Sequence, residues 1–389
     1  RNVLLKLGYT KDEANEFVAG PAFQAWWLMN NLEGWGGPNS DNWYQQRERL
    51  QKQIMKRMKE LGINVCLPGY SGMVPHDAKE RLGLDVADPG KWNDYKRPAF
   101  LQPTSKRFAE IASIYYKEQQ RLYGKADFYS MDPFHEGGNA GGVDLRKAGE
   151  AIMGAMKAVN PNAVWVVQAW GACPYPSMIK HLKNGDMLVL DLYSENRPQW
   201  GDPESTWYRK EGFNGHDWAF CMLLNFGGNV GMFGKLQHVV DEYYKARQSK
   251  FASTLKGVGL TMEGIENNPV MYELVSELPW RDAKFSWKEW LHDYVEARYG
   301  NINNAKVHDA WLLLARSVYG AGAKIVEQGC HESVLCARPA LDVYQVSSWS
   351  EMEEFYNPDD VIRAARLMVE ASHEVKANDN FRYDLVDVT

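Results

Sequence analysis

Six short apolar runs recur along the first 264 residues of the chain, and stretches with helical spacing separate most of them. Near-continuous apolar strands that alternate with helices are typical of a parallel β-sheet whose faces are covered by helices. The pattern therefore predicts an α/β fold. The six predicted strands are residues 64–70, 126–136, 163–170, 186–195, 219–229 and 255–264.

Apolar residues three and four positions apart predict the helices between these strands. Residues 42–61 are strongly charged, but they carry apolar residues at such spacings from Leu50 to Leu61. Residues 104–122 and 145–159 follow a similar pattern. Helices and strands that alternate in this way favour a closed barrel or an open doubly wound sheet.

Beyond about residue 280 we expect no further strands, because only helical patterns follow. These patterns cover residues 286–300, 307–320 and 358–375, and the last residues also resemble part of a helix. The sequence therefore predicts an α/β domain at residues 1–280 and an α-helical domain at residues 281–389.

Six strands fit an open sheet, whereas a (β/α)8 barrel needs two more. The open sheet of a nucleotide-binding protein is disfavoured, because the run GGNAGG at 137–142 lacks the spacing of a dinucleotide-binding loop. A barrel carries its chemistry at the carboxyl ends of its strands. Polar and aromatic residues fall at such ends here, namely Glu136, Trp170, Glu195, Asn225 and Glu263.

Two of these residues are acids that follow apolar strands. Glu136 ends the segment DPFHE, and Glu263 lies in the segment TMEG. A carboxylate is costly to bury unless it is paired, so an acid at a strand end normally points into a polar site. Its alternative role is to cap a helix or to pair with an arginine. Two acids at one barrel mouth suit glycoside hydrolysis, which needs an acid and a nucleophile or base.

Other kinds of site have weaker support. His135 and His216, with Asp132 and Glu136, resemble a metal cluster, but neither H-x-H nor H-E-x-x-H spacing occurs. A serine hydrolase is disfavoured because the chain has no G-x-S-x-G motif. The sequence therefore calls for no metal and no organic cofactor.

The aromatic content points to sugar as the ligand. The chain has 15 tryptophans among its 389 residues, and flat indole rings can stack on apolar sugar faces. A net charge of −6 disfavours nucleic acid, and no apolar run is long enough for a membrane span. The candidates for a sugar platform are Trp26, Trp27, Trp35, Trp43 and Trp170, although any one of them alone is more commonly a core residue.

Several long motifs resemble glycoside hydrolase family 89, the family of the alpha-N-acetylglucosaminidases. The resemblance runs over essentially the whole chain, and the runs LNFGGN and EGIENN are long and specific. The motifs are GPAFQAWWLMNNLEGWGGP (20–38), LPGYSGMVP (67–75), VVQAW (166–170), LVLDLYSE (188–195), CMLLNFGGNVGMFG (221–234), GVGLTMEGIENNPVMYELVSELPW (257–280) and FRYDLVDVT (381–389).

The resemblance implies a (β/α)8 TIM-type barrel followed by an all-α domain. In the family two further strands precede the GPAF segment, so we expect the first two barrel strands to lie outside this chain. We likewise expect only the first part of the helical domain to be present.

The resemblance also implies roles for single residues. Glu136 matches the general acid/base in the D-x-F-x-E segment, and Glu263 matches the nucleophile. Trp26 and Trp170 match aromatic positions near the sugar, and His331 lies near a histidine of the helical domain. His135 replaces an asparagine of the mammalian members, which would bind the 2-substituent of the sugar. The substrate-binding set is completed by Glu195 and Asn225.

The predicted function is a retaining exo-glycoside hydrolase that releases terminal α-linked N-acetylglucosamine from a glycan. The alternatives are a barrel that binds sugar without catalysis, and a glycosidase of different sugar specificity. The chain has no N-x-S/T sequon, which favours a bacterial enzyme that is exported by a signal outside this chain.

Overall fold

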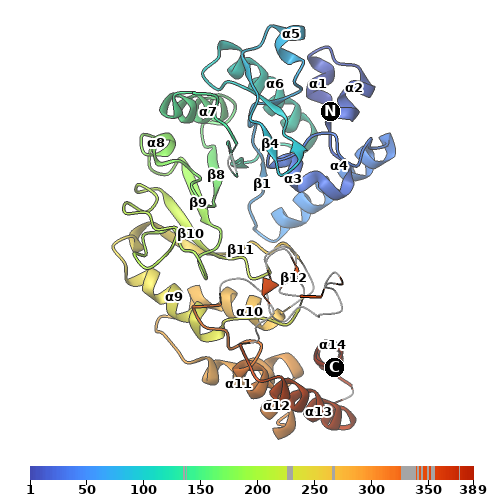
Figure 1. The fold of residues 1–389 in the computed structure, drawn as a ribbon, viewed down its shortest axis with the longest axis vertical. Helices are drawn as coiled ribbons and strands as arrows, with labels where there is room; N and C mark the ends of the chain where they lie inside the picture. The colour runs from blue at the N-terminus through green and yellow to red at the C-terminus, as the bar shows by residue number, and fades with distance from the viewer. Residues whose placement is uncertain are drawn as a thin grey trace. The chain divides into compact units, whose positions relative to one another are not determined.

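All six predicted strands are present in the computed structural model, where they form one sheet in their sequence order (Figure 1). The pairs β1–β7, β7–β8 and β8–β9 are parallel, as the apolar runs predicted. The strands are β1 (Cys66–Pro68), β7 (Phe128–Ser130), β8 (Val164–Ala169), β9 (Met187–Asp191), β10 (Asp217–Met222) and β11 (Leu255–Leu260).

The structure describes residues 1–134, 136, 138–225, 231–264, 268–325, 339, 341–342, 345–347, 350–351, 355–375 and 377–389. Within these residues the chain divides into two compact units. The first unit comprises residues 1–191 and 211–218, and the second comprises 192–210 and 219–389. The predicted domain boundary at residue 280 is a different division, and it stays a prediction.

The three helices predicted from apolar spacing in the first unit are confirmed. They are α4 (Asp41–Glu60), α6 (Lys106–Tyr123) and α7 (Leu145–Val159). Each begins after a side chain that accepts a hydrogen bond from a backbone N–H of the first turn, and these capping residues are Ser40, Ser105 and Asp144. The shorter α8 (Pro176–Ile179) begins with proline, whose missing N–H is not needed there.

The segment between β1 and α6 contains small strands that the sequence did not predict. β2 (Met73–Val74), β6 (Ala99–Leu101) and β3 (Val86–Ala87) form an antiparallel sheet in the order β2-β6-β3. β4 (Lys91–Trp92) and β5 (Tyr95–Lys96) pair as a hairpin. Strands of two or three residues are too short to show an apolar period.

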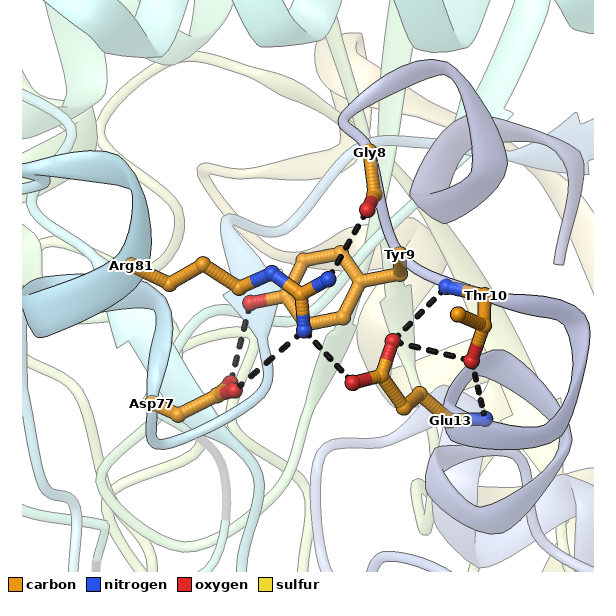
Figure 2. Close-up of polar contacts among 6 residues, drawn as sticks. All are labelled: Gly8, Tyr9, Thr10, Glu13, Asp77 and Arg81. Atoms are coloured by element: carbon orange, nitrogen blue, oxygen red, sulfur yellow. Dashed lines mark hydrogen bonds and ion pairs between the residues drawn. The ribbon is translucent and has the colours of Figure 1, made fainter.

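Short helices α1 (Asn2–Lys6), α2 (Lys11–Phe17) and α3 (Gln24–Leu28) begin the chain. A polar network ties α2 to α5 (Ala78–Leu82), as Figure 2 shows. Arg81 on α5 donates to Glu13 Oε1 and to the Gly8 carbonyl oxygen, and its guanidinium lies 4.3 Å from the centre of the Tyr9 ring. The hydroxyl of Tyr9 donates to Asp77 at 2.9 Å.

Thr10 and Glu13 form a capping box at the start of α2. The Thr10 hydroxyl accepts from the Glu13 N–H, and Glu13 Oε2 accepts from the Thr10 N–H at 2.7 Å. These bonds and the Arg81 guanidinium lower the pKa of Glu13 to about 2, with the bond to Arg81 as the largest cause. Glu13 is therefore ionised over the physiological range.

The second unit continues with α9 (Leu236–Gln248), α10 (Pro269–Glu277), α11 (Trp287–Tyr299), α12 (Ala305–Arg316), α13 (Pro358–Val375) and α14 (Asp379–Val388). The predicted helices after residue 280 are thus confirmed. However, α12 starts and ends earlier than 307–320. Its start is set by Asn304, whose Oδ1 caps the N–H groups of Lys306 and Val307. The expectation of no later strand is wrong, since β12 (Gln345–Ser347) pairs with β13 (Ser350–Glu351). Two such short strands give no readable period in the sequence.

A buried ionic network joins α11 to α14. The Arg298 guanidinium donates to both oxygens of Asp384 at 2.5 and 2.7 Å, and the Tyr299 hydroxyl donates to Asp384 at 2.6 Å. Trp311 on α12 donates to the Tyr299 hydroxyl. Bidentate pairing of this kind offsets the cost of burying both charges.

No helix among the described residues is both long and apolar enough to span a lipid bilayer.

Replacing Thr10 with alanine should remove the capping box at the start of α2. We expect the free energy of unfolding to fall by about 1 kcal/mol, the usual cost of losing a threonine cap. Urea unfolding followed by circular dichroism measures the change. Thr104 is exposed and forms no cap, so T104A is the matched control. Equal stability of T10A and T104A would contradict a stabilising capping box.

Candidate active site

Glu136 lies in a strained loop that follows the carboxyl end of β7. Phe134 and Glu136 both have positive backbone φ angles, 60° and 45°, which non-glycine residues adopt at a cost of about 1–3 kcal/mol each. Neighbouring groups hold the loop in this conformation. Trp165 donates its indole N–H to the Met131 carbonyl oxygen at 2.7 Å, and Phe134 packs edge-on against Phe100. Such strain is typical of functional sites.

A chain of three polar side chains orients the Glu136 carboxyl group. The buried Arg97 guanidinium donates to Asn31 Oδ1 and to the Glu136 carbonyl oxygen, both at 2.8 Å. The amide nitrogen of Asn31 in turn donates to Glu136 Oε2 at 2.7 Å. Because arginine can only donate, Asn31 must turn its oxygen toward Arg97 and its N–H group toward Glu136. Burial lowers the pKa of Arg97, while the Glu136 charge opposes that shift.

The two predicted aromatic residues are each linked to this loop through the backbone. The Trp26 carbonyl oxygen on α3 accepts from the Asn31 N–H at 2.9 Å. Trp170 directly follows β8 and exchanges two backbone hydrogen bonds with Cys173, whose thiol faces the Phe134 carbonyl oxygen at 3.5 Å. Trp26 is 40 % exposed, which leaves its ring accessible to a ligand. Within the first unit, the structure therefore connects Trp26, Glu136 and Trp170.

Glu263 follows β11 in the second unit, and its backbone is positioned by Asn225. The buried Asn225 Oδ1 accepts from the Glu263 N–H at 2.8 Å. Thr261, two residues earlier, donates its hydroxyl to the Leu192 carbonyl oxygen at 3.0 Å. The Glu263 side chain itself is exposed.

Glu195 supports the turn that places Asn225. Its Oε1 accepts from the N–H groups of Leu223 and Leu224, at 2.9 and 2.8 Å. Leu224 has a φ of 59°, and the Asn225 N–H donates back to the Leu223 carbonyl oxygen at 2.7 Å. This is a γ-turn of the rare, strained form, and the carboxylate holds it from one side. The structure thus links Glu195, Asn225 and Glu263.

Burial dominates the electrostatics of Glu195. The side chain is 1 % exposed, and this desolvation raises the pKa of Glu195 to about 7 despite the two backbone donors. Its Oε2 atom has no hydrogen-bond partner among the described residues. Nearby, burial lowers the pKa of His238 to about 4, and its Nε2 contacts the Glu195 carbonyl oxygen at 3.0 Å. The geometry gives Glu195 a supporting role, and its predicted contact with sugar stays a prediction.

Two predicted site residues, His135 and His331, lie outside the described residues. The alternative metal cluster around Glu136 has no support within the described part of the chain, where Asp132, Glu136 and His216 form no group with ligand spacing. His216 is buried, and its Nε2 contacts the Ile179 carbonyl oxygen at 2.9 Å. Asp132 Oδ1 accepts from the Gln168 N–H at 2.6 Å.

Asn31 and Arg97 were not predicted from the sequence as site residues. Asn31 belongs to the motif GPAFQAWWLMNNLEGWGGP, which carries the family resemblance, but the motif predicts no role for this residue. Arg97 follows the β4–β5 hairpin, where no period or motif marks it. A buried arginine is rare unless it is paired, but burial at this position cannot be read from the sequence.

Glu195→Gln should change how the free energy of unfolding depends on pH. A carboxyl pKa raised on folding stabilises the native state below pH 4.5, and this contribution is lost as the pH rises through about 7. Wild type should therefore lose on the order of 3 kcal/mol relative to E195Q over this window. Denaturant unfolding of both proteins at several pH values measures the difference, in which titrating groups that do not interact with Glu195 cancel. Glu150 is exposed, so Glu150→Gln is the control. If the free energies of unfolding of wild type and E195Q change with pH in parallel, Glu195 does not have a raised pKa.

Comparison with known proteins identifies the family of the chain. A family model described as the alpha-N-acetylglucosaminidase (NAGLU) tim-barrel domain matches residues 1–282, and a model of the C-terminal domain matches residues 290–389. Human alpha-N-acetylglucosaminidase is 34 % identical over 407 residues, which cover 100 % of this chain and 52 % of the human protein.

Solved structures of a family 89 glycoside hydrolase from Clostridium perfringens are also similar. Its complex with 2-acetamido-1,2-dideoxynojirimycin has a TM-score of 0.89 and 33 % identity, over 100 % of this chain and 44 % of that one. The same TM-score and identity hold for its complex with PUGNAc and for a variant with two glutamates changed to glutamine, in complex with its substrate GlcNAc-alpha-1,4-galactose. The chain spans about half the length of these relatives. The chain therefore belongs to the alpha-N-acetylglucosaminidase family, glycoside hydrolase family 89.

Proposed function

We propose that the protein is a retaining exo-glycoside hydrolase that releases terminal α-linked N-acetylglucosamine from glycans. Membership of family 89 supports the sugar and the linkage, since a relative binds GlcNAc-alpha-1,4-galactose as its substrate. That relative was complexed with its substrate as a variant carrying two glutamate-to-glutamine changes, which supports a mechanism with two glutamates. The observation that carries the proposal is the Arg97–Asn31–Glu136 chain, which orients one carboxyl group for proton transfer.

Glu136 acts as the general acid and then as the general base. Its Oε2 faces an N–H donor, so the proton of the neutral form resides on Oε1. Glu136 Oε1 has no hydrogen-bond partner within the described residues, and it is the atom that gives its proton to the leaving oxygen. The strained backbone and the hydrogen bond from the Asn31 side-chain amide together keep this atom in place before substrate binds.

Glu263 acts as the nucleophile in the first of two displacements. Its carboxylate attacks the anomeric carbon while the glycosidic C–O bond breaks and the leaving oxygen takes the Glu136 proton. In the second displacement, water attacks the glycosyl-enzyme ester, Glu136 removes a proton from the water, and Glu263 leaves as a carboxylate. Two inversions at the anomeric carbon give net retention. Trp26 and Trp170 supply flat apolar surface for the sugar ring.

Substitution of each glutamate should separate the two displacements. With p-nitrophenyl α-N-acetylglucosaminide, E263Q should lose at least about a thousandfold in kcat. With an alkyl or sugar leaving group, E136Q should lose about 10²–10⁴-fold in kcat/KM, whereas a dinitrophenyl leaving group, which needs no proton, should reduce that loss. Proton NMR of the first-formed product should show the α-anomer.

Glu150 is exposed, so Glu150→Gln is the matched control for both variants. First formation of the β-anomer would contradict retention. A wild-type protein that binds N-acetylglucosamine but turns over no α-glycoside would instead identify a sugar-binding barrel, and turnover of a different glycoside would identify another specificity.

Asn31→Ala should weaken catalysis through the orientation of Glu136. We expect kcat/KM to fall about tenfold to a hundredfold for substrates with poor leaving groups, because a carboxyl misplaced by an ångström transfers its proton poorly. The loss should be much smaller with dinitrophenyl leaving groups. Equal losses for both kinds of substrate would show that Asn31 has only a structural role.

A further inference from the structure

A group of three metal-ligating side chains lies on the helical part of the second unit. His292 and Glu296 stand one turn apart on the same face of α11, and His308 extends from the first turn of the neighbouring helix α12. Within the described part of the chain, this is the one group of at least three such residues whose donor atoms cluster, all within 4.8 Å of one another.

The three side chains already contact one another. His308 Nε2 lies 2.5 Å from Glu296 Oε1, and the rings of His292 and His308 stack with centres 4.6 Å apart and planes inclined by 17°. An imidazole binds a metal in its own ring plane, so one of the two stacked rings must turn before both can bind the same ion; their donor atoms already lie within 4.8 Å. Donor atoms around a tetrahedral zinc ion stand about 3.3 Å apart, for metal–ligand distances of about 2.0–2.1 Å. The exposed His292 has room to turn.

The surroundings support ligation at these three residues. The second oxygen of Glu296 accepts from the Asn303 N–H at 3.4 Å, which leaves Oε1 for the ion. The Asp293 carboxylate lies 3.7 Å from His292 Nδ1, where it favours a proton on that nitrogen and leaves Nε2 as the ligand atom. The side chains of Glu296 and His308 are 17 % and 18 % exposed, so an ion can enter from solvent.

We propose that His292, Glu296 and His308 bind a divalent transition-metal ion of the zinc class, which links α11 to α12. Two imidazoles and one carboxylate select zinc, cobalt or nickel over calcium and magnesium, which prefer oxygen donors alone. Water completes the coordination. The ion stabilises the helix pair and takes no part in the glycosidase chemistry proposed above, so the two proposals stand or fall separately. The H-x-x-x-E spacing of His292 and Glu296 was readable in the sequence, but His308 joins them only through the fold.

The test is metal binding by the whole chain after removal of metal with a chelator. Titration with Zn²⁺ in a calorimeter should show one equivalent per chain, and the temperature of half-unfolding should rise with free Zn²⁺. Co²⁺ should give the visible absorption bands of a tetrahedral site. H292A, E296Q and H308A should each weaken Zn²⁺ binding at least tenfold and abolish the thermal shift. His181 is exposed and lies outside the group, so H181A is the matched control and should match wild type.

Three results would overturn the proposal. They are the absence of saturable Zn²⁺ binding, binding that H292A and E296Q leave unchanged, and binding that Ca²⁺ reproduces with equal affinity. If H308A fails to fold, H292A and E296Q decide the outcome, because His292 is largely exposed and glutamine keeps the hydrogen-bonding capacity of Glu296 toward His308.

Discussion

A buried guanidinium has donors only, and this single constraint sets the direction of the hydrogen bonds around Glu136. Arg97 forces the Asn31 oxygen to face it, so the Asn31 N–H group must face Glu136. The same guanidinium binds the Glu136 carbonyl oxygen and thereby secures a backbone with positive φ. Three residues distant in the sequence thus determine which carboxyl oxygen is left to carry a proton. Loss of Arg97 would leave both the amide orientation and the loop conformation undetermined.

In the second unit, a buried hydrogen-bond acceptor takes the place that the Arg97 donor has in the first unit. There an acceptor, the buried Glu195 carboxyl group, fixes two backbone N–H groups and the strained turn at Leu224. That turn aims Asn225 at the Glu263 backbone. In each unit, a candidate catalytic glutamate at a strand end is therefore held by a buried polar residue on another segment. Such preorganisation is the condition under which a carboxyl group transfers protons or attacks carbon efficiently.

The sheet and the long helices were predictable, because they repeat apolar residues with a period that survives in the sequence. Glu136 and Glu263 were identified because both follow predicted strands. The supporting residues Asn31 and Arg97 were not, since they meet Glu136 only after the chain has folded. Glu195 was named from its place at a strand end, but its burial beneath a turn could not be read from the sequence, and its contact with sugar stays a prediction. Strands of two or three residues, such as β2 and β12, lack a readable period altogether.

The bidentate pair between Arg298 and Asp384 has a practical consequence for dissecting this protein. Asp384 lies on α14, whereas its partner lies on α11, 86 residues earlier. Removing α14 would leave the partly buried Arg298 guanidinium and the buried Tyr299 hydroxyl without their carboxylate partner. Any shortened form of the helical region must therefore keep both α11 and α14 if this pair is to stay intact.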